Sequence, residues 1–78
     1  MWEELKFVRD CRKSFAKAHG MSDWKARLYF FAFNVNRELY EGRGVIGHHG
    51  YDPVLIAHNI IEMSGGYLPE MKTDYSRR

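Results

Sequence analysis

Residues 22–41, SDWKARLYFFAFNVNRELYE, constrain the fold most strongly, because one helix built from them is apolar on two opposite sides. On a helical wheel of about 100° per residue, an aliphatic side collects Trp24, Leu28, Phe31, Ala32, Val35 and Leu39. The opposite, aromatic side collects Ala26, Tyr29, Phe30, Phe33 and Tyr40, with Arg37 among them. A surface helix has one apolar stripe, which packs on the core. The second apolar side must therefore be shielded from solvent by another part of the chain or by another molecule.

The aliphatic side is predicted to face the core, and the aromatic side is predicted to be an interface. Aromatic side chains and arginine are enriched at protein interfaces. The predicted interface residues are Tyr29, Phe30, Phe33, Arg37 and Tyr40. The sequence leaves three alternatives for what packs against the aromatic side: other helices of the same chain, a second copy of the protein, or a different protein.

The size of the chain favours self-association. Its 78 residues indicate a single domain over residues 1–78, and a chain of this size buries only about 60–65% of the surface that its unfolded form exposes. Cys11 is the only cysteine, so an intrachain disulfide is excluded. Oligomerisation is a common stabiliser of small folds, and a lone thiol fits a reducing, cytoplasmic location.

Periodicity and end signals predict a small all-α domain of three helices, with the two-faced second helix at its centre. The helices are expected over residues 2–18, 22–41 and 53–63. Gly20 ends the first, Ser22 caps the second, and Asp52 followed by Pro53 begins the third.

The connections are predicted to be irregular. Four glycines in residues 42–51 predict a loop. The tail, residues 67–78, contains Pro69 and lacks a sustained period, so we expect Tyr67 and Leu68 to dock and the rest to be partly ordered.

The sequence offers little chemistry. Residues 42–47 spell G-x-G-x-x-G, but they follow a predicted helix, whereas a dinucleotide site follows a strand. His48 and His49 are adjacent, without the ligand spacing of a zinc site. Catalytic residues, metals, cofactors and small-molecule substrates are therefore not expected. A membrane partner is not expected either, because no stretch approaches 18 apolar residues.

Nucleic-acid binding is the main alternative. Ala16, Gly20 and Ser22 are spaced as in the centre of a helix-turn-helix, which residues 15–29 resemble. Five basic residues are candidates for phosphate contacts: Lys6, Lys13, Lys17, Lys25 and Arg27. Against this, the second helix has only narrow polar seams to present to base edges.

We therefore expect a small non-enzymatic protein–protein interaction module, a homodimeric regulator or inhibitor that docks on a partner. Accessory regulators, including those of phages, often have this size and lack catalytic patterns. The alternative is a small helical DNA-binding regulator.

Overall fold

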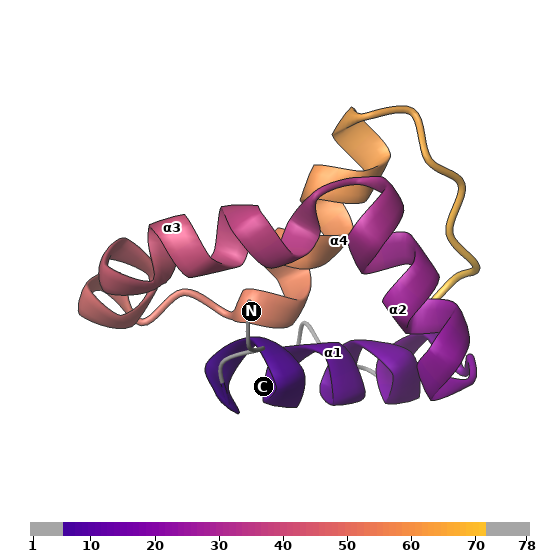
Figure 1. The fold of residues 1–78 in the computed structure, drawn as a ribbon, viewed down its shortest axis with the longest axis horizontal. Coiled ribbons are helices and arrows are strands. Elements are labelled where there is room, and N and C mark those ends of the chain that lie inside the picture. The colour runs from indigo at the N-terminus through magenta and orange to yellow at the C-terminus, as the bar shows by residue number, and fades with distance from the viewer. Residues whose placement is uncertain (1–5, 72–78) are drawn as a thin grey trace, which may run out of the picture.

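The computed structural model of the protein describes residues 6–71, in which helices are the regular structure (Figure 1). The helices are α1 (Lys6–His19), α2 (Asp23–Ala32), α3 (Val35–His49) and α4 (Pro53–Met63). Figure 1 shows α1 along one edge, α2 rising from one end of it and α3 running back above it. The all-α fold class is confirmed for this part of the chain. The predicted first turn at residues 2–5 and the last seven residues of the predicted tail lie outside the described residues.

The predicted single helix over residues 22–41 is wrong, because the chain breaks at Phe33 and Asn34. Asn34 has a φ of 58° and a ψ of 29°, a left-handed conformation that asparagine tolerates better than most residues. The amide of Phe33 donates to the Tyr29 carbonyl at 3.1 Å and closes α2. A new helix, α3, then begins at Val35, so the three-helix description becomes one of four helices in residues 6–71.

The predicted loop over residues 42–51 is also mostly helical. α3 continues through the glycine run to His49 and ends where Gly50 takes a φ of 67°. Ile46 is buried in this stretch and anchors the last turns of α3 to the core. Each glycine in a helix costs about 1 kcal/mol relative to alanine. Tertiary burial of residues such as Ile46 outweighs this cost.

The predicted helix ends are otherwise confirmed. Gly20 has a φ of 64°, and the amide of Met21 donates to the Ala16 carbonyl at 2.9 Å, which is the pattern of a Schellman C-cap. The Ser22 hydroxyl accepts an amide of the first turn of α2 at 3.4 Å. The Asp52 carboxylate accepts an amide of the first turn of α4 at 3.0 Å. These local signals depend on a few neighbouring residues and so could be read from the sequence.

The side of α2 that faces the core is the aromatic one, whereas the aliphatic side was predicted to do so. Ala26 and Phe30 are fully buried, and the Phe30 ring meets Phe15 edge to face at 5.2 Å. The other fully buried large side chains include Val8, Val35, Leu39, Val54 and Ile61.

The predicted core residues Trp24, Leu28 and Phe31 are 66%, 53% and 80% exposed. Val35 and Leu39, predicted for the same side, are buried as expected. The break at residues 33–34 explains the difference. In a continuous helix these five side chains would share one side, whereas two separate helices can each turn a different side inward.

The C-terminal segment, residues 64–71, closes the fold beside α2. Leu68 is buried, which confirms its predicted docking, but the Tyr67 ring is 84% exposed and does not dock. The carbonyl of Tyr67 does bind the protein, because the Tyr29 hydroxyl donates to it at 2.7 Å.

Candidate protein-interaction surface

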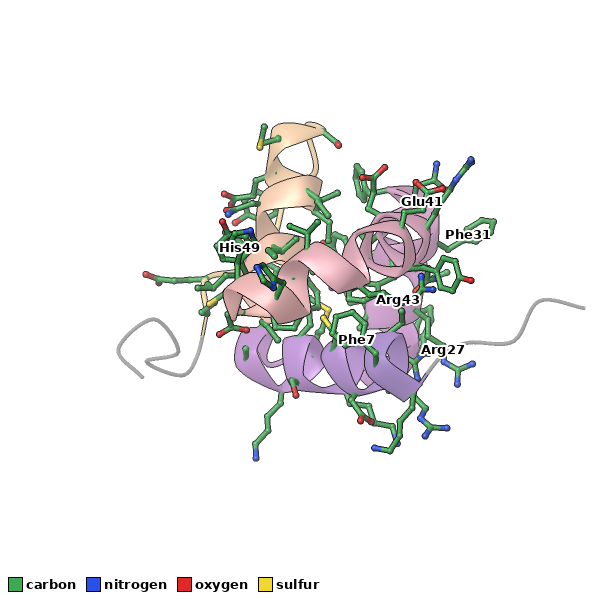
Figure 2. The ribbon with its side chains drawn as sticks, turned by 90° about the vertical axis from the view of Figure 1, so that its left-hand side faces the viewer. Phe7, Arg27, Phe31, Glu41, Arg43 and His49 are labelled. Atoms are coloured by element: carbon green, nitrogen blue, oxygen red, sulfur yellow. The ribbon has the colours of Figure 1, made fainter. Side chains whose placement is uncertain are left out.

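An exposed apolar face runs along α2. Trp24, Leu28 and Phe31 are spaced four and three residues apart, so they lie on one side of the helix, and we call them the outer face of α2. Figure 2 shows Phe31 projecting away from the body of the protein, with Arg27 on the same side. Single exposed apolar residues are ordinary, but three large ones in a row mark a surface that can be covered by another molecule.

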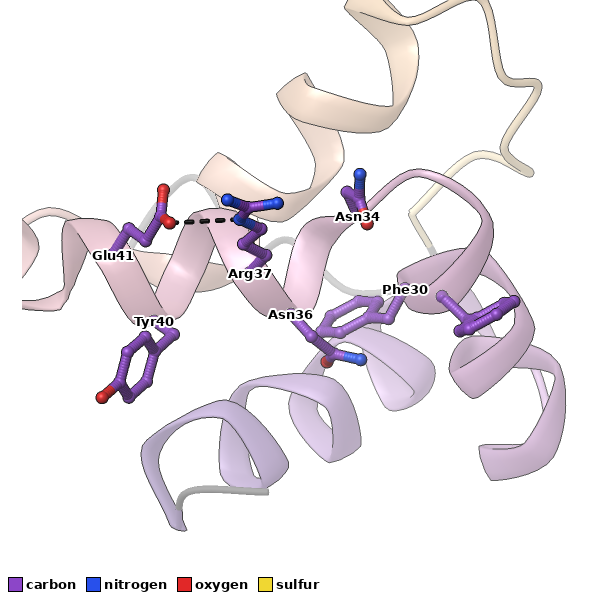
Figure 3. A pocket seen from close by; sticks show the side chains of 7 residues that line it. Phe30, Asn34, Asn36, Arg37, Tyr40 and Glu41 are labelled. Carbon is purple, nitrogen blue, oxygen red and sulfur yellow. Dashed lines mark hydrogen bonds and ion pairs between the residues drawn. The ribbon is translucent and has the colours of Figure 1, made fainter. Parts of the chain in front are cut away.

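A groove adjoins this face where α2 ends and α3 begins (Figure 3). Its volume is about 480 Å³. Its lining residues are Phe30, Phe31, Asn34, Asn36, Arg37, Tyr40 and Glu41. The groove exists because the break at residues 33–34 separates two helices that the sequence alone predicted to be continuous.

Two cationic contacts shape the α3 wall of the groove. The Arg37 Nε lies 3.1 Å from the Glu41 Oε2, and both side chains are exposed, so the pair stabilises the fold little. The Arg43 guanidinium lies 4.1 Å from the centre of the Tyr40 ring and donates to the Tyr40 carbonyl at 2.5 Å. This cation–π contact supports the orientation of an aromatic ring that lines the groove.

Asn36 carries an unsatisfied polar atom in the same wall. Its side-chain oxygen is buried and has no hydrogen-bond partner. A buried acceptor without a partner costs roughly 1–3 kcal/mol. A donor that enters the groove can recover part of this cost if the amide rotates toward it.

The predicted interface residues separate into two groups. Phe30 is fully buried, so its ring is unavailable to a partner in this conformation. Tyr29 and Phe33 are partly buried and lie under the C-terminal segment, where Gly66 packs against the Phe33 ring.

Arg37 and Tyr40 are exposed and line the groove. The structure thus brings two of the five predicted residues to the exposed surface beside the outer face of α2. That face itself was assigned to the core by the sequence, although the helical wheel had already grouped its three residues.

The buried His19, with the partly buried His58 beside it, holds the C-terminal segment in place. The His19 Nδ1 donates to the Pro69 carbonyl at 2.7 Å, which leaves its Nε2 as an acceptor for the His58 Nδ1 at 3.2 Å. The His58 Nε2 in turn lies 3.1 Å from a Glu62 carboxylate oxygen. Burial lowers the pKa of His19, so its ring stays neutral at a pH where an exposed histidine would be charged.

Catalytic and metal chemistry gain no support from the geometry. Cys11 is buried, and burial raises the pKa of its thiol to about 12, so it stays protonated and unreactive at neutral pH. His48 and His49 are exposed on the last turn of α3. Within residues 6–71, no group of three or more His, Cys, Asp or Glu side chains is arranged so that it could hold a metal ion.

The predicted nucleic-acid residues are all exposed where the structure places them. Lys6, Lys13 and Lys17 share the solvent side of α1, and Lys6 pairs with Asp10 at 2.8 Å. Lys25 and Arg27 flank the outer face of α2. The helix that a helix-turn-helix would insert into the major groove therefore presents large apolar side chains outward, which cannot form the hydrogen bonds by which most base edges are read.

Comparisons with protein-family models, curated proteins and solved structures found no match to this chain. Across residues 6–71, every helix is too short or too polar to cross a bilayer.

Proposed function

We propose that the protein is a non-enzymatic protein–protein interaction module that self-associates through the outer face of α2 and acts as a small regulator or inhibitor by docking. The observation that carries this proposal is the exposure of Trp24, Leu28 and Phe31 on one side of a single helix. Large aromatic side chains of this kind dominate the energetics of protein interfaces.

A second copy is the occupant that the surface fits best. A standard interface buries about 800 Å² on each partner, and a buried Trp or Phe contributes roughly 150–250 Å² of it. Trp24 and Phe31 would supply part of this area, and Leu28, with Tyr40 and Arg37 of the adjoining groove, would add to it. Self-association also compensates for the small core of a 78-residue chain.

The test is the mass of the protein in solution at several concentrations, measured by multi-angle light scattering. We expect the wild type to approach twice the chain mass of 9.2 kDa as concentration rises. Leu28→Glu and Phe31→Glu should remain at the chain mass and keep a wild-type circular dichroism spectrum, because both side chains are exposed.

Val45→Glu is the matched control. Val45 is 59% exposed on α3, outside the outer face of α2, so the same change of apolar residue to carboxylate should leave self-association intact. A wild type that stays at the chain mass up to millimolar concentration would refute the proposal.

DNA binding is the second candidate, supported by the basic solvent side of α1. Lys6, Arg9, Lys13 and Lys17 are exposed there, with Asp10 as the acidic residue among them. Affinity for duplex DNA should fall steeply between 50 and 200 mM salt, and Lys13→Glu with Lys17→Glu should abolish it. Absence of binding at 50 mM salt would end this candidate.

A further inference from the structure

We infer that two copies meet with their α2 helices antiparallel, Leu28 on the two-fold axis, and Trp24 of each copy inserted in the groove of the other. This inference rests on the proposed function, because it specifies how the outer face of α2 self-associates.

The symmetry follows from the spacing of the outer face. A two-fold interface uses the same patch on both copies, and Leu28 is the middle member of this patch. α2 has ten residues and is therefore about 15 Å long. With Leu28 on the axis and the helices antiparallel, Trp24 of one copy lies opposite Phe31 and Ala32 of the other, next to the groove.

The groove has the properties that an indole ring requires. Phe31 and Tyr40 supply aromatic surface, and the Arg43 contact supports the Tyr40 ring. An indole N–H that leaves water needs an acceptor. The groove offers the exposed Glu41 carboxylate, and the buried Asn36 side-chain oxygen, which has no partner, becomes a second acceptor if its amide rotates toward the groove.

A parallel arrangement fits the same face less well. It would place Trp24 against Trp24 and would leave both grooves without an occupant. The antiparallel arrangement does bring the Arg27 side chains of the two copies to the same flank. Each Arg27 lies 3.5 Å from Asp23 of its own copy, and Asp23 also accepts from Arg12 at 3.3 Å, so one carboxylate offsets only part of the positive charge that meets there.

Disulfide cross-linking tests this register, because a disulfide requires Cα atoms about 4.4–6.8 Å apart. Single variants Leu28→Cys, Trp24→Cys and Phe31→Cys are oxidised mildly and separated without reductant. Leu28→Cys should cross-link to itself, and Trp24→Cys mixed with Phe31→Cys should form the heterodimer.

Trp24→Cys alone should remain uncross-linked, as should the control Val45→Cys. The native Cys11 does not interfere, because it is buried and its thiol has a pKa of about 12.

A double-mutant cycle gives a second measurement that does not depend on cysteine chemistry. Trp24→Ala and Tyr40→Ala should each weaken dimerisation at least about tenfold. The double variant should be little weaker than the worse single variant, because both remove the same contact.

The outcomes separate the two proposals. A wild-type dimer in which Trp24→Cys cross-links to itself as readily as Leu28→Cys would overturn the antiparallel register and leave the proposed function intact. Independent, multiplicative effects of the two alanine variants would overturn the insertion of Trp24 in the groove. A monomeric wild type would refute the proposed function and this inference together.

Discussion

Phe30 and Phe31 form a matched pair that tests the orientation of α2. The two residues are adjacent and identical in chemistry, but Phe30 is 0% exposed and Phe31 is 80% exposed. Truncating a core phenylalanine to alanine costs about 3–5 kcal/mol, and the edge-to-face contact with Phe15 places Phe30 in that class. The same change at an exposed site is usually within about 0.5 kcal/mol.

The magnitude is large relative to the total. A chain of 78 residues has a free energy of unfolding of roughly 4–12 kcal/mol at 0.05–0.15 kcal/mol per residue. Phe30→Ala is therefore expected to unfold the protein partly or completely. Phe30→Leu removes less volume and should remain folded with a measurable loss within the usual range of about 0.5–3 kcal/mol.

The assay is urea denaturation followed by circular dichroism at two protein concentrations. Two concentrations are needed because self-association through Phe31 would add stability that grows with concentration. At the lower concentration, Phe31→Ala should match the wild type, whereas the Phe30 variants should be destabilised at both. If Phe31→Ala lost 3 kcal/mol or more at low concentration while Phe30→Ala lost less than 1, the orientation of α2 described above would be refuted.

Three further predictions concern other parts of the fold. Gly44→Ala should stabilise the protein by about 0.5–1 kcal/mol, because Gly44 lies inside α3 and a Cβ there would meet no other atom. Gly66→Ala should destabilise the protein, because its Cβ would lie 2.6 Å from the Phe33 ring. Equal denaturation midpoints for the two variants would contradict this prediction. Asn34→Val should cost about 1–2 kcal/mol because its left-handed φ of 58° disfavours a β-branched residue, whereas Asn34→Gly should be tolerated; a Val variant as stable as the wild type would show that the break does not need this conformation. Burial lowers the folded-state pKa of His19, so the unfolded chain takes up the proton first, and stability should fall as pH drops below about 6.5 toward the lower folded pKa. Melting temperatures measured from pH 8 to pH 5 should show this fall in the wild type and a smaller fall in His19→Asn, whose side chain does not titrate. Equal falls in both proteins would assign the effect to other groups.

Much of the secondary structure was readable from short stretches of sequence. The caps at Gly20, Ser22 and Asp52 depend on interactions within about four residues, and the structure has each of them. The break at Asn34 was not readable, because asparagine is also found inside helices and its left-handed conformation is selected by the packing of α2 and α3. The helical glycine run was missed for the same reason, since the burial of Ile46 holds it.

The sequence predicted which residues of the candidate surface lie together, but not that they are exposed. The helical wheel already separated Trp24, Leu28 and Phe31 from Tyr29 and Phe30 as two apolar sides of one segment. It could not tell which side faces inward, because both are apolar and either can exclude water at similar gain per unit area.

The sequence by itself determined that the described part of the chain is helical, where α1 ends, where α2 begins and where α4 begins and ends, and that residues 22–32 are apolar on two sides. Only the tertiary structure decided that Ala26 and Phe30 face α1 and that the outer face of α2 remains in solvent. The physical reason is the turn at residues 33–34: it uncouples α2 from α3, so Val35 and Leu39 enter the core without carrying the outer face of α2 with them.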